Sequence, residues 1–539
     1  MSATENRDTA LPWSTLSHNL AHFLTRNRAR LGDRPAIIWG DKRWTWAELD
    51  ARVSALAAAF REDFGLGHGD RVLLQSANNN QMTEVMLACW RIGAVWVPAN
   101  FRQSPDEVAY LAQKAEVRAM VCEAAFPDHA AACRSAAPDL AHVIEIAGDA
   151  FGADYEALVA RHLGTDVPNA PVDRDDPCWL FFTSGSTGRP KAVVLTHGQL
   201  TFTTLNHLND LMPGTTPGDA SLVVAPLSHG AGMHQLTQIA AGVVSILPPP
   251  GRFDVAEAWR LVEHYKVTNM FTVPTIVKML TEHPAVDAHD HSSLRYVIYA
   301  GAPMYRADQK HALGKLGKVL VQYFGLGEVT GAITVLPPRD HHIEDGPEAR
   351  VGTCGFERTG LHVTIQDDKG AILGPHETGE ICVAGPAVCA GYYKDDGANA
   401  KSFRNGWFLT GDLGHMDAER YLYITGRASD MYISGGSNVY PREIEEVLLT
   451  HPDVSEVAIL GIADEKWGEV GLAAVVLEDG SAATAEALAA HLDGKVAKYK
   501  LPARYVFLEE MPKTGYGKIT KKLVREHLDA LGLLSGEPA

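Results

Sequence analysis

The hydrophobic pattern of the first 300 or so residues alternates short apolar runs with amphipathic stretches. Short apolar runs bounded by polar or glycine-rich positions predict buried strands, and apolar residues spaced three or four apart predict helices. Such alternation is typical of parallel sheets with crossover helices. The predicted helices are Met82–Ile92 and Glu107–Lys114, and the predicted strands are Arg71–Gln75, Ala94–Pro98, Ala119–Cys122, Ser221–Ala225, Val243–Leu247, Met270–Val273 and Tyr296–Ala300.

The pattern changes after about residue 350. Short alternating strands at His362–Asp367 and Gly379–Ala384, with a strand-and-turn region at Gly406–Tyr423, are typical of a small barrel or a distorted sheet. A new segment begins at Gly426-Arg427, and it combines two predicted strands with two predicted helices: Val454–Leu460, Leu472–Glu478, Glu443–Leu449 and Glu486–Val496. We therefore predict an α/β protein with an N-terminal domain over residues 1–425 and a smaller α+β domain over residues 426–539.

The composition is that of a globular protein with an acidic surface. Of 539 residues, 46% are hydrophobic and 21% charged, and 48 Lys+Arg against 66 Asp+Glu give a net charge of −18. This balance argues against a broad nucleic-acid-binding face but not against a locally positive site for an anion. The seven cysteines are scattered without a CxxC pair, which favours reduced thiols in a cytoplasmic enzyme. Neither a signal peptide nor an integral membrane segment is predicted.

A loop rich in hydroxyl and glycine residues follows the apolar run Cys178–Phe182. It reads Thr-Ser-Gly-Ser-Thr-Gly-Arg-Pro-Lys over residues 183–191, and a second strand-like run follows at Ala192–Leu195. A Walker loop has glycine before its lysine and a helix after it, so this loop is of another kind. Its amides and hydroxyls can donate hydrogen bonds to phosphate oxygens, and its glycines let the backbone approach closely.

A second loop, more than 300 residues later, complements the first. It reads Lys-Thr-Gly-Tyr-Gly-Lys over residues 513–518 and can bring a lysine to a reacting centre. Together the two loops indicate an enzyme that activates a carboxylate with ATP.

These loops, with five further segments in the same order, resemble the AMP-forming acyl-CoA synthetases of the adenylate-forming (ANL) superfamily. The resemblance spans nearly the whole chain. It implies an N-terminal domain of two sheet-and-helix subdomains plus a small barrel-like region, and a mobile C-terminal lid. The five segments are Pro226–Gly230, Tyr299–Pro303, Gln322–Glu328, Leu409–Asp412 and Gly426-Arg427.

The resemblance implies a role for each matching residue. Lys518, Glu328 and His229 are the predicted catalytic residues. Glu328 and Thr183 are the predicted ligands of Mg²⁺, because a carboxylate-held cation offsets the charge of the polyphosphate. The predicted ATP- and AMP-binding residues are Thr183, Ser184, Gly185, Ser186, Thr187, Gly188, Lys191, Gly301, Ala302, Pro303, Gln322, Tyr323, Phe324, Gly325, Gly327, Asp412 and Arg427.

The acid and coenzyme A sites are also assigned by resemblance. The predicted acid pocket consists of His229, Gly230, Met233, Thr275, Gly301, Gly327 and Ile333. Because most of these side chains are small or apolar and no arginine is placed to hold a second carboxylate, a monocarboxylic acid, aliphatic or aryl, is favoured. The predicted coenzyme A site is Ser434, Gly435, Gly436, Trp467 and Lys500, reached when the lid turns about a hinge at Ser429. The sequence does not decide whether the protein forms a homodimer. The histidine pairs of the chain lack further ligands, so no zinc site is predicted.

Three positions depart from the family pattern. Gly327 stands where the family has a threonine before the glutamate, which either weakens adenylation or makes room for a bulkier acid; Thr330 is a nearby source of a hydroxyl. Ser429 replaces the usual charged hinge residue. Ser228 replaces an aromatic residue before His229.

The sequence thus predicts a carboxylic acid:CoA ligase that uses ATP, Mg²⁺ and coenzyme A. Two alternatives remain at this stage: an adenylating enzyme that loads a separate carrier protein, and a non-catalytic nucleotide- or acyl-binding relative.

Overall fold

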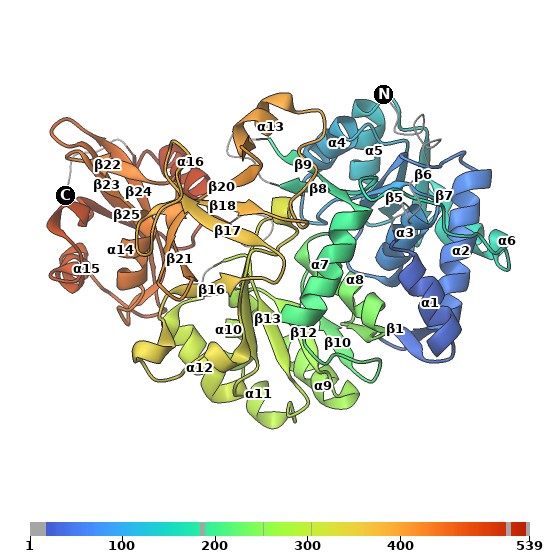
Figure 1. The fold of residues 1–539 in the computed structure, drawn as a ribbon, viewed down its shortest axis with the longest axis horizontal. Helices are drawn as coiled ribbons and strands as arrows, with labels where there is room; N and C mark the ends of the chain where they lie inside the picture. The colour runs from blue at the N-terminus through green and yellow to red at the C-terminus, as the bar shows by residue number, and fades with distance from the viewer. Residues whose placement is uncertain (1–17, 184–188, 252, 303, 514–518, 535–539) are drawn as a thin grey trace.

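The structure is a computed structural model that describes residues 18–534, apart from residues 184–188, 252, 303 and 514–518. It contains two large sheets and a smaller third one, as the family resemblance implies. In Figure 1 the two large sheets and their helices form the main body, and the third sheet lies at the C-terminal end, coloured orange to red. None of the helices in the described ranges is long and apolar enough to cross a membrane.

The first large sheet has seven strands in the order β7-β6-β5-β3-β4-β8-β9. Its neighbours pair in parallel, except that β8 and β9 form an antiparallel hairpin around the predicted phosphate loop. The strands are β3 (Arg71–Gln75), β4 (Val95–Pro98), β5 (Ala119–Glu123), β6 (His142–Ile146), β7 (Ala153–Asp154), β8 (Pro177–Thr183) and β9 (Lys191–Thr196). The helices between them are α3 (Asn80–Arg91), α4 (Pro105–Lys114), α5 (Pro127–Ala136) and α6 (Tyr155–His162).

The second large sheet has 14 strands and combines two patterns. Its parallel part is β1 (Pro35–Trp39), β10 (Ala220–Val223), β11 (Val244–Leu247), β12 (Asn269–Thr272), β13 (Tyr296–Tyr299) and β14 (Leu320–Phe324), with β2 (Lys42–Thr45) antiparallel at one edge. Its antiparallel part is β15 (Thr334–Leu336), β16 (Thr353–Glu357), β17 (His362–Gln366), β18 (Gly379–Ala384), β19 (Phe403–Arg404), β20 (Trp407–Met416) and β21 (Tyr421–Arg427). The predicted barrel-like region is therefore continuous with this sheet, because β15 pairs with both β14 and β16.

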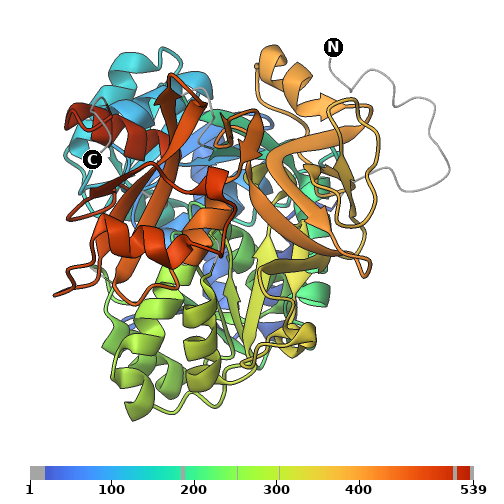
Figure 2. The same ribbon diagram turned by 90° about the vertical axis from the view of Figure 1, so that its left-hand side faces the viewer.

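The C-terminal segment forms a five-stranded sheet of its own. Figure 2 shows this sheet and its helices beside the strands of residues 353–427. Its strands are β22 (Tyr432–Ser434), β23 (Ser437–Val439), β24 (Val454–Asp464), β25 (Gly468–Leu477) and β26 (Arg504–Phe507). Its helices are α14 (Pro441–Leu448), α15 (Ala485–Leu492) and α16 (Lys521–Ala530). Two separate apolar cores, one on each face of β24 and β25, hold it together.

Two helices lie between the large sheets, α7 (His197–Asp210) and α8 (Gly230–Ala241). Helix α7 begins at a capping box in which Thr196 accepts from the amide of Gln199 while the Gln199 side chain accepts from Thr196. Helix α8 ends at Gly242, whose φ of 77° only glycine adopts readily. The remaining helices are α1 (His22–Leu31), α2 (Trp46–Glu62), α9 (Val255–Tyr265), α10 (Pro274–Glu282), α11 (Ala285–Ala288), α12 (Arg306–Leu316) and α13 (Asp396–Ser402).

The main core connects the first sheet to helix α8 through a series of aromatic rings. Trp90 and Trp96 meet edge to face at 6.5 Å between ring centroids, and Trp96 lies 4.5 Å from Trp179. Trp179 in turn lies 5.6 Å from Phe181, two residues further along β8. Aromatic pairs at these separations stabilise a core beyond the area they bury. The series ends at the edge of the predicted site.

Four histidines are buried as neutral groups, and this predicts acid instability. Burial lowers the pKa of His197 to about 3 and the pKa values of His234 and His341 to about 4, and it lowers the pKa of His207 well below its usual value. In the unfolded chain these groups bind protons below about pH 6.5. Protonation thus favours the unfolded state, so stability present above pH 6.5 is lost as the pH falls towards 4.

We expect each of these histidines to lower the free energy of unfolding by up to about 1.4 kcal/mol per pH unit between pH 6.5 and 4. Urea unfolding at pH 7, 6 and 5 measures this slope. His341→Gln should reduce the slope by about one proton. A slope that is the same in His341→Gln and the parent protein contradicts the prediction.

Candidate functional site

The ends of the β8–β9 hairpin hold the first part of the site. Thr183 is the last residue of β8 and pairs directly with Lys191, the first residue of β9. The residues from Ser184 to Gly188, all predicted to bind phosphate, lie outside the described residues. The Nζ atom of Lys191 lies 4.9 Å from the ring centre of Tyr392. The hairpin thus presents a hydroxyl and a cation at the two ends of the predicted loop.

The carboxylate of Glu328 is the centre of this part of the site. Its side chain is buried, and its Oε1 atom accepts from the hydroxyl of Thr183 at 2.9 Å and from the hydroxyl of Tyr392 at 3.1 Å. Burial raises the pKa of Tyr392, and the negative charge of Glu328 adds to this, so the phenol stays protonated as a donor. Two hydroxyls from distant segments therefore orient one carboxylate, and they join the two predicted metal ligands, Thr183 and Glu328.

The loop that carries Glu328 is shaped by close backbone contacts. A Cβ atom on Gly325 would lie 2.3 Å from the carbonyl carbon of Gly331, so the loop closes on itself only with glycine at position 325. Thr330 has a left-handed φ of 50°, and its hydroxyl lies 2.6 Å from that of Thr203 on α7. Because it is buried and held there, Thr330 does not replace the threonine missing at position 327.

The space beside Gly327 is filled. A Cβ atom on Gly327 would lie 2.5 Å from Cε1 of Phe181 and 2.8 Å from Cγ2 of Thr183. The glycine therefore leaves no empty volume for a bulkier acid at this position, because the ring of Phe181 occupies it. That ring also stacks on His229, with centroids 4.5 Å apart and an angle of 30° between the planes. Gly327, Phe181 and His229 thus form one packed unit.

This packing predicts that restoring the family's threonine is harmful. Gly327→Thr should lower the rate of acid-dependent pyrophosphate release by about 10- to 100-fold, in line with an overpacking energy of 1–3 kcal/mol. The double variant Phe181→Leu/Gly327→Thr should recover much of the loss. Gly314→Thr is a matched control, since no atom lies within 4 Å of its Cβ position. Full activity of Gly327→Thr in the presence of Phe181 contradicts the prediction.

Only some of the residues predicted to line the acid pocket lie near one another in the structure. Gly230 opens α8 beside aromatic rings, because its Cβ position lies 2.9 Å from Cζ of Phe271 and 3.6 Å from the hydroxyl of Tyr323. Met233 is buried on the same helix. Ile333 is buried in a different cluster, under the antiparallel strands, and Thr275 is exposed in the first turn of α10. The structure therefore gathers His229, Gly230 and Gly327 more closely than the other predicted pocket residues.

The predicted adenine-side residues lie at the ends of β13 and β14. Gly301 and Ala302 follow β13 and are exposed, and Gly301 has a φ of 86°. Gln322 accepts a hydrogen bond from Tyr299 at 3.1 Å, which fixes the end of β14 against β13. Tyr323 and Phe324 complete that strand, and Pro303 lies outside the described residues. Adjacent parallel strands thus end at the same edge, where ligands bind in open α/β sheets.

The predicted ribose-binding pair is formed across two antiparallel strands. Asp412 on β20 is directly opposite Arg427 on β21, and Nε of Arg427 donates to Oδ1 of Asp412 at 3.1 Å. Burial raises the pKa of Asp412, and the guanidinium of Arg427 opposes that rise. The pair places an acceptor and a donor fork at the junction with the C-terminal segment.

Three of the predicted coenzyme A residues lie in the β22–β23 hairpin, and a fourth, Trp467, packs against it. Gly435 and Gly436 connect β22 to β23 with φ values of 55° and 80°, as a two-residue turn of this kind requires. Trp467 covers this turn, because its ring lies 2.9 Å from the Cβ position of Gly435, while half of its surface stays exposed. Ser434 is buried at the end of β22. Lys500 is held elsewhere, since its Nζ atom donates to Glu443 at 2.6 Å.

The structure describes the predicted hinge residue but not the predicted catalytic lysine. Ser429 is exposed two residues after Arg427, and its hydroxyl donates to Asp430 at 3.1 Å. Lys518 lies outside the described residues. Lys513, at the start of the same loop, is held by Glu456 at 2.5 Å.

Comparison with known proteins decides the family. A family model described as AMP-binding enzyme matches residues 24–393, and the model of the AMP-binding enzyme C-terminal domain matches residues 443–518. The chain belongs to the AMP-binding enzyme family. A feruloyl-CoA synthase from an Amycolatopsis species is 37% identical over 502 residues, which are 92% of this chain and 97% of that protein.

Two further matches agree. An indoleacetate–CoA ligase of Aromatoleum aromaticum is 33% identical over 510 residues, covering 94% of this chain and 98% of that protein. The structure of the amide bond synthetase McbA from Marinactinospora thermotolerans has a TM-score of 0.84 at 28% identity and covers 95% of this chain and 100% of that one. The predicted class is confirmed: the protein is an AMP-forming acyl-CoA synthetase.

Two residues of this synthetase were missed by the sequence reasoning. Phe181 could have been found, because it lies two positions before Thr183 on one strand and residues so spaced share a face. Tyr392 carries no such signal. It reaches Glu328 because residues 390–393 hydrogen-bond to β9, as in the bond from the amide of Val194 to the carbonyl of Gly391 at 2.9 Å. Arg358 is also buried near Tyr323, but it is paired with Asp210 and His207.

The oxygen atoms around Glu328 suit a hard divalent cation. Mg²⁺ binds through one or two carboxylates together with substrate phosphates, and hydroxyl and carboxylate oxygens are its preferred donors. Thr183 and Glu328 supply these atoms at the end of the phosphate loop. Among the described residues no group of three or more His, Cys, Asp and Glu side chains forms a metal site by itself.

Proposed function

We propose that this synthetase activates an aryl monocarboxylic acid. The observation that carries the proposal is the aromatic lining at the start of α8, where Phe271 and Tyr323 stack with centroids 6.0 Å apart and both approach Gly230. Phe181 adds a third ring beside His229. Flat side chains of this kind suit an aromatic ring, which packs against them in offset or edge-on contact. The names of the feruloyl and indoleacetate relatives support the same class of acid.

The reaction takes place in two steps on this chain. In the first, a carboxylate oxygen of the acid attacks the α-phosphorus of ATP, the bond to the β-phosphate oxygen breaks, and pyrophosphate leaves. In the second, the thiol of coenzyme A gives up its proton to solvent, its sulfur attacks the acyl carbon, the bond to the AMP oxygen breaks, and AMP leaves with the electron pair of that bond.

The residues of the first step have separable roles in this proposal. Thr183 and Glu328 would hold Mg²⁺, which when bound supplies positive charge to the phosphates. Tyr392 keeps the carboxylate of Glu328 in place through its hydroxyl. Asp412 accepts from the ribose hydroxyls, and Arg427 orients it. Lys518 donates to the oxygens that gain charge in the transition state.

The second step uses the C-terminal domain of residues 426–539. We propose that it turns about Ser429, at an exposed position after β21, so that the turn of Gly435 and Gly436 faces the acyl-adenylate. An exposed indole at Trp467 beside these two glycines suits a thin pantetheine chain and the coenzyme's base. Lys500 can contact the coenzyme phosphate only after it leaves Glu443, to which its Nζ atom donates at 2.6 Å.

The decisive experiment measures pyrophosphate and AMP release for matched acids. Phenylacetate and cinnamate are compared with hexanoate and octanoate, each with and without coenzyme A. We expect pyrophosphate release with the aryl acids and AMP release that depends on coenzyme A. A preference for the alkyl acids contradicts the aryl proposal. Faster acyl transfer to a phosphopantetheinylated carrier protein than to coenzyme A favours the carrier-loading alternative.

A further inference from the structure

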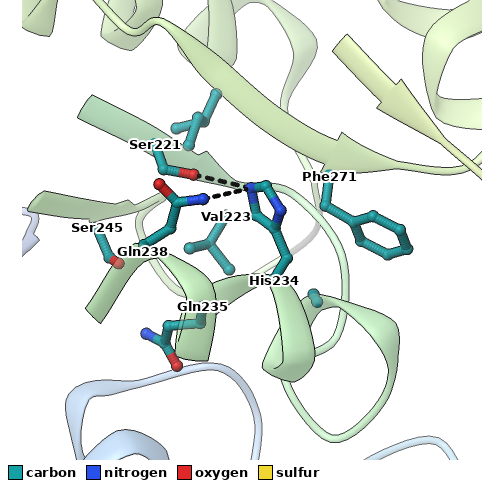
Figure 3. A pocket seen from close by; sticks show the side chains of 9 residues that line it. Ser221, Val223, His234, Gln235, Gln238, Ser245 and Phe271 are labelled. Atoms are coloured by element: carbon teal, nitrogen blue, oxygen red, sulfur yellow. Dashed lines mark hydrogen bonds between the residues drawn. The ribbon is translucent and has the colours of Figure 1, made fainter. Parts of the chain in front are cut away.

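A small cavity lies between α8 and the second large sheet (Figure 3). Its volume is about 10 Å³, the space of a single water molecule, and Ser221, His234, Gln235 and Gln238 are among its lining residues. A polar enclosure of this size suits a buried water and is too small for a substrate.

Tyr392 contacts both charged groups at the end of the phosphate loop. Its hydroxyl donates to Oε1 of Glu328 at 3.1 Å, and its ring centre lies 4.9 Å from Nζ of Lys191. The position of this one side chain therefore affects a predicted metal ligand and a predicted phosphate contact together. What fixes the backbone of Tyr392 thus matters for the first step of the reaction.

One edge of the backbone around Tyr392 pairs with β9 in an antiparallel bridge. The amide of Val194 donates to the carbonyl of Gly391 at 2.9 Å. The amide of Tyr393 donates to the carbonyl of Ala192 at 2.8 Å. These bonds use the two neighbours of Tyr392, so the amide and carbonyl of Tyr392 itself point away from β9.

The other edge is held by the side chain of Asn399 on α13. The amide of Tyr392 donates to Oδ1 of Asn399 at 2.7 Å, and Nδ2 of Asn399 donates to the carbonyl of Tyr392 at 3.1 Å. Because a backbone amide only donates and a carbonyl only accepts, the two bonds fix which way the side-chain amide faces. A Cβ atom on Gly391 would lie 2.8 Å from Oδ1 of Asn399, so glycine lets the two segments meet.

Helix α13 is fixed at both ends. At its start the side chain of Asp395 accepts from the amide of Ala398 at 3.0 Å, and the carbonyl of Asp395 accepts from the amide of Asn399 at 3.0 Å. At its end it continues into β19, which pairs with β20 of the second large sheet. Asn399 therefore supports Tyr392 from a helix that is itself anchored.

We infer that Asn399 is a positioning residue of the magnesium site, which holds the backbone of Tyr392 against β9 and thereby keeps the carboxylate of Glu328 in place. The inference rests on the proposed function, in which Glu328 is a ligand of Mg²⁺, and adds a residue of α13 to that site. Loss of a group that orients a metal ligand typically lowers metal affinity by about 10- to 100-fold. Asn399 acts one contact further from the metal, so the lower end of this range, about 10-fold, is expected.

The test measures magnesium binding without turnover. The melting temperature is followed at a fixed concentration of α,β-methylene-ATP, in which carbon replaces the oxygen that leaves, while Mg²⁺ is titrated. Asn399→Ala should raise the Mg²⁺ concentration at the midpoint of this titration by about 10-fold. A merely structural role would lower the melting temperature without ligand and leave the midpoint in place, and an unchanged midpoint overturns the inference.

Further variants separate this role from a general effect on α13. Lys401→Ala is the matched control, since Lys401 is an exposed residue of the same helix, and it should leave the midpoint as in the parent. Asn399→Asp keeps the acceptor for the amide of Tyr392 and loses the donor to its carbonyl, so its midpoint should lie between those of the parent and Asn399→Ala.

A double variant shows whether Asn399 acts through the phenol. When Tyr392→Phe has already removed the hydroxyl, Asn399→Ala should shift the midpoint by less than about twofold further. Full addition of the two single effects overturns the inference. A midpoint that is unchanged in Glu328→Gln would instead contradict the proposed metal ligand.

Discussion

Lys518→Ala is expected to slow formation of the acyl-adenylate by about 10²–10³-fold. In the proposed mechanism, the lysine of the Gly-Tyr-Gly-Lys loop supplies a positive charge to the oxygens between the carboxylate and the α-phosphate, where charge builds up in the transition state. Such a donor acts in the transition state more than in the bound substrates, so kcat should fall more than the affinity for ATP. Pyrophosphate release in single-turnover mixtures with the preferred acid measures the step directly.

The control for this prediction lies in the same loop. Lys513→Ala removes a lysine that is held by Glu456, and it should change the rate by less than about threefold, as expected of a surface ion pair. A second control supplies the acyl-adenylate ready made. Because the proposed mechanism gives Lys518 a role in the first step alone, thioester formation from this intermediate should stay near the parent rate in Lys518→Ala. Full-speed adenylation by Lys518→Ala would remove the basis of the proposed mechanism.

The second large effect is expected at Glu328. Glu328→Gln removes the charge of the predicted magnesium ligand but keeps its shape, so adenylation should fall by about 10² or more. The concentration of Mg²⁺ that gives half the maximal rate should rise as well. Titration of pyrophosphate release with Mg²⁺ at fixed ATP separates the two effects. An unchanged magnesium dependence in Glu328→Gln contradicts the assignment of the ligand.

Tyr392→Phe tests the support of that carboxylate. It removes a hydroxyl 3.1 Å from Glu328 without changing the ring beside Lys191, so the loss should be smaller, about 10- to 100-fold, as for residues that orient a metal ligand. Glu263→Gln is the matched control, since Glu263 is a partly exposed residue of α9 that pairs with His289, away from the site. A larger loss in Tyr392→Phe than in Glu328→Gln would mean that the phenol itself touches the substrates.

The local elements could be predicted because their signals are local. The apolar runs predicted β3, β4, β5 and β18 to within one residue of the observed bounds. Helix α4 begins two residues before its predicted start, because Ser104 and Glu107 form a capping box there. Strand pairing carries no such signal. That β15 joins the antiparallel strands to the parallel sheet depends on contacts between distant segments.

The site divides in the same way. The sequence by itself determined the class of chemistry, because its ordered motifs resemble those of one enzyme family, and that resemblance named Thr183, Glu328, Asp412 and Arg427. Only the tertiary structure decided that Phe181 fills the space beside Gly327, that Tyr392 supports Glu328 and that Asn399 holds the backbone of Tyr392. These features arise from packing between segments far apart in the chain, and packing depends on distances that no local pattern records.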